Sequence, residues 1–437
     1  MQTQIVITFV VMIAAYTVAK WRKLSVEISM FLAAAAGGIY GAFNSTLPLN
    51  QLFRHLVEGS FTYLDVILIF VTATIFMAII SESGGVNYAV KNTIKYFYNK
   101  RLIALLLLML ITLVPGALTG AGSVSLLVVG APVAMALGYL GIKQRRVAAI
   151  LFIIAGLSAA APPVNIWAMI LSAGTAIPYV GFELTLGIPV LLLGTFSILV
   201  LGWKKHEKSD LKSALKQMPE IPKGMKWWKV LIPFIVFFGL VIALRIWPFS
   251  LPIMGLPLLF IISAVFALIL SPKRINILKL SRDTVKKLNP LLATMIAVGM
   301  LQQIMTATGV RGLISFTVIS TPLILLFISL VIIIPVSEGV FTYGGAAIIG
   351  IPLVWFFDSI GLHATVAIAG LSLLWPLGDG LPPTALIGRL SVMVTEYKKS
   401  YWSFLKSTWL PWIVITIVGI LMVVFSTQLG FLVKWSS

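Results

Sequence analysis

Two stretches of the same design decide the fold of this chain: GLSAAAPPVN at residues 156–165 and PLGDGLPPTA at residues 376–385. Each sets a double proline inside a long apolar run. A proline within a helix removes one N–H donor and clashes with the carbonyl four residues earlier. Each stretch therefore predicts a helix that is broken near its middle, and we place these broken helices at residues 147–177 and 364–394.

The apolar runs around these breaks indicate a membrane protein. Of the 437 residues, 59% are hydrophobic and 10% are charged, whereas a soluble domain averages about 25% charged residues. Many runs approach the roughly 20 residues that span a bilayer as a helix, and they do not alternate as the strands of a β-barrel do. We expect an all-α polytopic membrane protein with apolar runs at 4–19, 25–43, 60–80, 102–142, 147–177, 185–203, 230–247, 252–270, 289–308, 320–357, 364–388 and 401–428.

The positive charges give the chain an orientation. The net charge of +19 comes from 32 Lys and Arg against 13 Asp and Glu, and on a soluble protein it would suggest nucleic acid. Here all the basic residues except Arg54, Arg245, Arg311 and Lys434 fall in loops on one side. Basic loops stay in the cytoplasm. We therefore expect a multi-pass protein of the cell (inner) membrane, with both termini outside and no nucleic-acid partner.

The chain also repeats itself at an offset of 220 residues. Several landmarks recur at this spacing: Pro115 and Pro335, Gly130 and Gly350, Pro132 and Pro352, and the two double prolines. We predict a first repeat over residues 1–203, a basic cytoplasmic linker over 204–229 and a second repeat over 230–437. Each repeat makes an odd number of crossings, so the second enters the membrane inverted. Inverted repeats with broken helices are typical of secondary transporters.

The runs 102–142 and 320–357 are each either two full spans or one re-entrant hairpin, because both begin and end on the same side. Their middles, LVPGALTGAGSVS and IPVSEGVFTYGGA, are rich in Gly, Ser and Thr and contain no ordinary loop. This composition favours a hairpin. Irregular backbone at that depth persists only where protein or a water-filled cavity surrounds it.

The breaks predict cation sites. The double prolines free the carbonyls of residues 158 and 159 in one repeat and of 378 and 379 in the other. Hard cations prefer such oxygen ligands, together with hydroxyls and carboxylates. We predict a first cation-binding site from Thr119, Gly120, Gly122, Ser123, Ser158, Ala159 and Pro162. We predict a second cation-binding site from Ser337, Glu338, Thr342, Gly378, Asp379 and Pro382.

The two predicted sites differ in charge. At the offset of 220, Glu338 corresponds to Leu118 and Asp379 to Ala159, so both acids belong to the second repeat. An ionisable group inside a membrane is costly and therefore suggests function. Either acid could carry a proton, while an interfacial position with access to water is the plainer alternative for each.

The substrate is expected at the same breaks, since the N-termini of half-helices suit a carboxylate. The candidate substrate-binding residues are Ser125, Asn165, Thr384 and Arg389. Arg389 has a second interpretation, as a positive anchor at the cytoplasmic face.

The blocks PGALTGAGSVSLLVVGAPVAMALGYLGI (115–142) and RRVAAILFIIAGLSAAAPPVNIWAMILSAG (145–174) resemble the large membrane subunit of tripartite ATP-independent periplasmic (TRAP) transporters. The second-half block from IPVSEGV to GLPPTALIG is similar to that family's second block. The resemblance covers the architecture of the whole chain, but its motifs span about a quarter of it. Two features depart from the family: Glu338 stands where an Asp is usual, and GDG precedes the second double proline.

The resemblance implies Na⁺-coupled symport of small organic acids by an elevator-type movement. It implies that Na⁺ is held between residues 120–123 and 158–162, and between 337–342 and 378–382. A small membrane subunit and a periplasmic substrate-binding protein would be partners, and elevator carriers often form homodimers. Beyond the coupling ion, no cofactor is expected.

Several alternatives stay open. A stand-alone carrier of the wider ion transporter superfamily, similar to citrate, gluconate and dicarboxylate carriers, is the first, with H⁺ in place of Na⁺ as its coupling ion. A channel is another. An intramembrane serine enzyme is disfavoured because it needs a base, and none of the three histidines lies in the core of a span.

Overall fold

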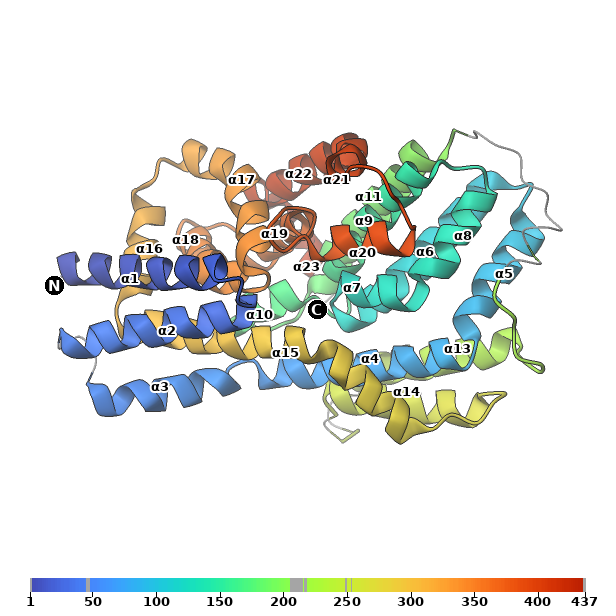
Figure 1. The fold of residues 1–437 in the computed structure, drawn as a ribbon, viewed down its shortest axis with the longest axis horizontal. Helices are drawn as coiled ribbons and strands as arrows, with labels where there is room; N and C mark the ends of the chain where they lie inside the picture. The colour runs from blue at the N-terminus through green and yellow to red at the C-terminus, as the bar shows by residue number, and fades with distance from the viewer. Residues whose placement is uncertain are drawn as a thin grey trace.

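The computed structural model describes residues 2–44, 48–204, 215, 218–247, 250–252 and 254–434, and all regular structure among them is helical. Ten of the helices in these ranges are long and apolar enough to cross a membrane. The predicted all-α polytopic class is therefore confirmed. Figure 1 shows α1, α2 and α3 side by side at one end of the molecule and α5 and α13 at the other, with α4 and α15 running between them.

Five helices precede the first predicted hairpin: α1 (Gln2–Trp21), α2 (Val26–Phe43), α3 (Leu49–Phe61), α4 (Leu64–Glu82) and α5 (Gly85–Phe97). Helices α1 and α2 pack on each other, and α2, α3 and α4 all pack against α15 (Ile277–Ala307). Helices α3 and α15 cross closely, since a Cβ at Gly299 would lie 2.2 Å from the carbonyl oxygen of Gly59. Two glycines thus let these backbones touch.

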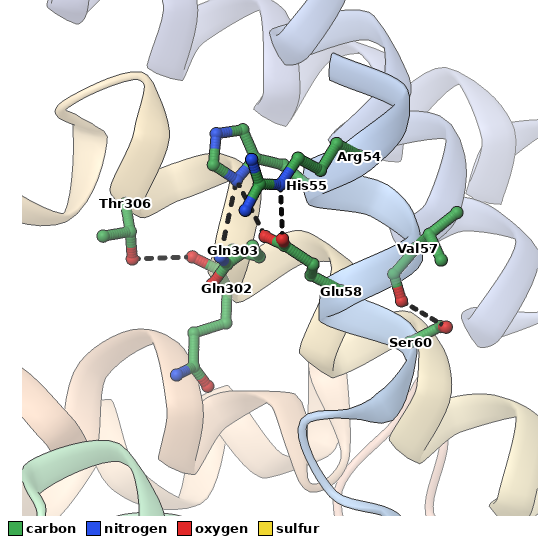
Figure 2. A network of polar contacts seen from close by, with 8 residues as sticks. All are labelled: Arg54, His55, Val57, Glu58, Ser60, Gln302, Gln303 and Thr306. Carbon is green, nitrogen blue, oxygen red and sulfur yellow. Dashed lines mark hydrogen bonds and ion pairs between the residues drawn. The ribbon is translucent and has the colours of Figure 1, made fainter. Parts of the chain in front are cut away.

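A polar network supports the same crossing (Figure 2). Arg54 Nε donates to Glu58 Oε1 at 2.6 Å, and His55 Nδ1 lies 3.6 Å from the other oxygen of that carboxylate. Across the interface, Gln303 Nε2 lies 3.4 Å from His55 Nδ1. Deeper in the crossing, Tyr63 donates to the side-chain oxygen of Gln302. One side-chain hydrogen bond thus joins α3 to α15, and a second joins α15 to Tyr63, the residue directly before α4.

The first half continues through α6 (Arg101–Thr119), α7 (Gly122–Ser125), the π-helical segment η1 (Leu126–Gly130), α8 (Ala131–Tyr139), α9 (Gln144–Ala160), α10 (Ile166–Thr175) and α11 (Phe182–Gly202). The second half contains α13 (Trp227–Ile246), α14 (Leu256–Leu270), α15, α16 (Val310–Ser320), α17 (Leu323–Phe341), the π-helical segment η2 (Ala346–Gly350), α18 (Ile351–Ser359), α19 (Ala364–Gly378) and α20 (Leu386–Val394). It closes with α21 (Tyr401–Leu405), the 3-10 segment η3 (Lys406–Thr408), α22 (Trp409–Val424), the 3-10 segment η4 (Gln428–Gly430) and α23 (Phe431–Lys434).

The first parts of the two broken helices form the centre of the core. Every residue of α9 from Val147 to Ala160 is buried, and so is every residue of α19. A helix that is apolar all round is either a membrane span or part of a protein core, and the burial of α9 and α19 on every side places both in the core. The two helices touch where a Cβ at Gly156 would lie 3.1 Å from the Pro376 side chain. Both predicted breaks are therefore located at the ends of buried helices.

Local structures recur at the offset seen in the sequence. The π-helical segments η1 and η2 lie 220 residues apart, and so do the starts of α8 and α18. Both double prolines contain a cis peptide bond, Pro162-Pro163 and Pro382-Pro383. In each half, the helix that ends at the predicted hairpin tip packs against the helix that ends at the break, α6 on α9 and α17 on α19. Re-entrance and inversion across a membrane stay predictions.

The structure corrects three predicted loops. The segment before residue 60 contains α3, the basic stretch 271–287 contains the beginning of α15, and residues 310–320 form α16. The sequence of α3 alternates polar and apolar residues around the helix, and the first turns of α15 carry several charges, so neither forms a continuous apolar run. Helix α16 is too short to span. Residues 205–214, 216 and 217 of the predicted linker 204–229 lie outside the described residues.

Candidate functional site

The tip of the first predicted hairpin rests directly on α9. Helix α6 ends at Thr119, and Gly120 follows with φ +72°, in the left-handed region that favours glycine. Gly122, the first residue of α7, approaches α9 so closely that a Cβ there would lie 2.2 Å from the carbonyl oxygen of Ala155. The turn therefore needs glycine at both positions, once for its conformation and once for its packing.

A second close contact fixes Ser158, the predicted cation ligand near the end of α9. A Cβ at Gly116 would lie 1.8 Å from Ser158 Oγ, so the serine side chain fits against the bare backbone of α6. The Ser158 hydroxyl donates to the carbonyl of Ala155 at 2.6 Å, and the Thr119 hydroxyl donates to that of Pro115 at 2.7 Å. Both oxygens keep lone pairs that could bind a cation.

The first break is closed by polar contacts of its own. The side chain of Asn165 accepts a 2.9 Å hydrogen bond from the Ala168 N–H as the N-cap of α10, and its amide donates to the carbonyl of Ala160 at 3.0 Å. Asn165 thus bridges the two half-helices. The Tyr179 hydroxyl donates to the carbonyl of Pro163 at 3.1 Å, and the Asn165 N–H donates to the same hydroxyl oxygen at 3.0 Å.

The second predicted site is built on a similar contact between α17 and α19. A Cβ at Gly378 would lie 2.1 Å from the carbonyl oxygen of Pro335 and 2.6 Å from the Cβ of Glu338. Ser337 Oγ donates to the carbonyl of Ile334 at 2.7 Å and accepts from Trp375 Nε1 at 3.3 Å. The structure therefore brings Glu338 of α17 beside Gly378 at the break, and Ser337 beside Trp375 one turn earlier in α19.

The second break is also closed by hydrogen bonds. The carbonyl of Gly378 accepts from the Leu381 N–H at 2.8 Å, and that of Asp379 accepts from the Gly388 N–H at 3.1 Å. Thr384 Oγ1 donates to the carbonyl of Gly339 at 2.9 Å, which ties the break to the hairpin. The Tyr401 hydroxyl donates to the carbonyl of residue 380 at 2.8 Å.

These bonds bear on the predicted cation ligands. In the first half, the carbonyl of Ser158 accepts from the Ala161 N–H at 3.2 Å. Three of the four carbonyls that the prolines were expected to free therefore have an N–H partner. A carbonyl oxygen has two lone pairs, so one acceptor position remains on each. Together with the serine and threonine hydroxyls, these oxygens are of the type that Na⁺ binds.

Two buried carboxyl groups define the most polar point of the core. The Glu338 residue is 1% exposed and Asp379 is 4% exposed, and the side chain of Glu338 lies against Gly378, the residue before Asp379. Trp167 Nε1, on α10 of the first half, donates to Glu338 Oε2 at 2.9 Å. The centroid of the buried Tyr343 ring lies 5.3 Å from that of the Trp167 ring. We call Glu338, Asp379, Trp167 and Tyr343 the acid cluster.

The four candidate substrate residues lie at different points around the breaks. The Ser125 hydroxyl donates to the carbonyl of Thr112 within the hairpin. Asn165 and Thr384 bridge their breaks as described above. The exposed side chain of Arg389 returns to the second break, where its Nη2 donates to the carbonyl of Pro383 at 2.8 Å. Each residue has a structural contact, and contact with a substrate stays a prediction for all four.

Sequence reasoning missed the aromatic donors of the site. Trp167 and Trp375 donate to the two adjacent residues of the second hairpin, and Tyr179 and Tyr401 each hold a carbonyl of a break. Two signals were available, since Trp167 follows the first double proline by four residues and Trp375 precedes Asp379 by four. Because membrane tryptophans commonly mark the interfaces, neither position predicts a buried donor by itself.

No known protein-family profile matches this chain, and no curated protein matches its sequence. Solved structures do match its fold. MtrF of Neisseria gonorrhoeae, described as illuminating a class of antimetabolite efflux pumps, superposes with a TM-score of 0.63 at 12% identity, over 86% of this chain and 84% of that one. The YdaH transporter of Alcanivorax borkumensis, described as having an unusual topology, gives 0.58 at 14% identity, over 88% and 89%.

Identities this low show the fold alone. The chain thus has the all-α polytopic fold of two membrane transporters over most of its length. These similarities do not show the finer assignment to the TRAP large subunit, which stays a resemblance of motifs.

Proposed function

We propose that this chain is a secondary active transporter that moves small organic anions without an accessory subunit, in the manner of a stand-alone ion transporter superfamily carrier. One observation carries the proposal: the acid cluster, which is buried at a helix break and joins the two halves through the Trp167–Glu338 hydrogen bond. A carboxyl group that binds an ion at the contact between the two halves of the chain is suited to coupling ion binding to movement of one half relative to the other.

The broken helices support an anion as the substrate. Helices α10 and α20 each begin directly after a break, and the positive end of a half-helix attracts carboxylates. Arg389 adds a full positive charge one turn into α20. The similarity of fold to two transporters is consistent with this proposal.

A cation is the natural coupling partner. When two buried carboxyl groups near each other are both ionised, their negative charges repel unless positive charge lies between them. Na⁺ held by the hairpins and break carbonyls is the first candidate for this charge. H⁺ is the second, because the two acids occur in the second half only and three of the freed carbonyls already have N–H partners.

The test is transport by the purified chain alone in proteoliposomes. Radiolabelled citrate, gluconate and succinate are offered under a Na⁺ gradient, a pH gradient or neither, with flux measured in both directions. We expect saturable transport driven by one of the two gradients. Asp379→Asn and Glu338→Gln should each reduce driven flux at least about tenfold, since each removes charge from the coupling site.

Matched acids outside the cluster provide the controls. Asp358 and Glu220 are exposed, so Asp358→Asn and Glu220→Gln should transport like the unmodified protein. Equal losses in the control and cluster variants would overturn the role of the acid cluster. Non-saturable flux that is indifferent to both gradients would indicate a channel.

A further inference from the structure

A basic pocket lies outside the acid cluster, where the beginning of α9 meets the end of α11 and the beginning of α22. Its volume is about 220 Å³, and its polar lining comes from Arg145, Arg146, Lys406 and Ser407, with Trp409 on one wall. Water in the liquid occupies about 30 Å³ per molecule, so this volume holds several waters. It therefore also has room for a phosphate group with its attached atoms.

The charges around the pocket all favour an anion. No acidic residue lines it among the described residues. None of its three basic residues takes part in an ion pair within the described part of the chain. Helix α9 begins at Gln144 and directs its positive end toward this region. The carbonyl of Gly202, at the negative end of α11, already accepts a hydrogen bond from Arg101.

A buried donor also lacks a partner here. Arg146 Nη1 is inaccessible to solvent and has no hydrogen-bond acceptor among the described residues. A buried donor on a charged group is stable only when an acceptor compensates for the water that it has lost. The Arg146 residue as a whole is half-buried and lines the pocket, so its positive charge is available to an anion there.

We propose that this pocket binds a phosphate group. A guanidinium matches two phosphate oxygens at once, and the pocket offers two guanidinium groups and one ammonium group. Trp409 is exposed at the beginning of the apolar helix α22, a position typical of the bilayer interface. Basic pockets between helices at that level bind anionic lipid headgroups. The phosphate thus comes either from an anionic lipid or from free phosphate in solution.

Native mass spectrometry of the full chain in detergent distinguishes these sources. The protein is titrated separately with phosphatidylglycerol, with zwitterionic phosphatidylcholine and with inorganic phosphate, and the thermal midpoint is followed in parallel. We expect a saturable complex with phosphatidylglycerol or with inorganic phosphate, and not with phosphatidylcholine. Arg146→Gln and Lys406→Gln should each weaken that complex about fivefold, and the double variant should weaken it further.

Arg22→Gln with Lys23→Gln is the matched control, since it removes two exposed positive charges that do not line the pocket. A lipid source is indicated if phosphatidylglycerol binds more tightly than inorganic phosphate, and a free source if the order is reversed. The proposal is overturned if neither phosphate compound binds, or if the pocket and control variants weaken binding equally. Unliganded midpoints within a few degrees of the unmodified protein show that each variant is folded.

Discussion

Trp167 and Glu338, which are separated by 171 residues in the chain, share a 2.9 Å hydrogen bond between the indole Nε1 and the carboxyl Oε2. The donor belongs to α10, which follows the first break, and the acceptor belongs to α17 of the second half. Both groups are buried, so no water replaces this bond when it is lost. The acid cluster therefore depends on both halves.

Replacing the indole should expose this dependence. Trp167→Phe keeps an aromatic ring but removes the donor, and a buried charged or polar group left without its partner costs about 1–3 kcal/mol. We expect a lower thermal midpoint in detergent and slower substrate flux. Trp409 is largely exposed, so Trp409→Phe should change stability by less than about 0.5 kcal/mol. Equal midpoints for the two variants would contradict the proposed importance of the bond.

The contact between α17 and α19 predicts a strong glycine effect. In Gly378→Ala the new methyl group would lie 2.1 Å from a backbone carbonyl, which cannot move as a flexible side chain does. Overpacking of this kind costs about 1–3 kcal/mol. A Cβ at Gly138, in α8, would meet nothing within 4 Å, so Gly138→Ala should be neutral or slightly stabilising. Thermal unfolding of both variants checks this order.

Asn165 can be tested for its two roles separately. Asn165→Ser keeps a neutral side-chain oxygen that can cap α10 but loses the amide that donates to the Ala160 carbonyl, whereas Asn165→Ala loses both. Losing an N-cap costs about 0.5–2 kcal/mol, so Ala should be the less stable variant. If substrate binding is instead the main role, both variants should keep the thermal midpoint and raise the KM.

The charge-based topology can be read with single cysteines, because the chain has none of its own. Cysteine at Lys23 should react with an impermeant maleimide only in inside-out vesicles, and cysteine at Arg245 only in intact cells. The reason is that basic loops remain cytoplasmic while the sparse positive charges lie outside. Labelling of both positions from the same side would overturn the predicted orientation.

The sequence predicts the helix breaks of this fold better than the contacts between distant elements. Proline and glycine act through the local backbone, so the breaks near Pro162 and Pro382 and the turn at Gly120 follow from the chain itself, whereas the turn at Thr342 places a β-branched residue at φ +52°. Helix α3 does not, because its pattern is amphipathic and its stability comes from packing on α15. The hydrogen bonds of Trp167 and Tyr401 could not be predicted for the same reason, because their acceptors lie in other elements of the fold.

The two π-helical segments change which residues of the following helices, α8 and α18, share a face. A π turn contains about one residue more than an α turn, and one residue corresponds to about 100° of rotation. A helical wheel drawn without interruption over 126–139 or 346–359 would therefore assign the side chains of α8 and α18 to faces displaced by more than a quarter of a turn. Because η1 and η2 occupy equivalent positions, the error has the same sense in both halves.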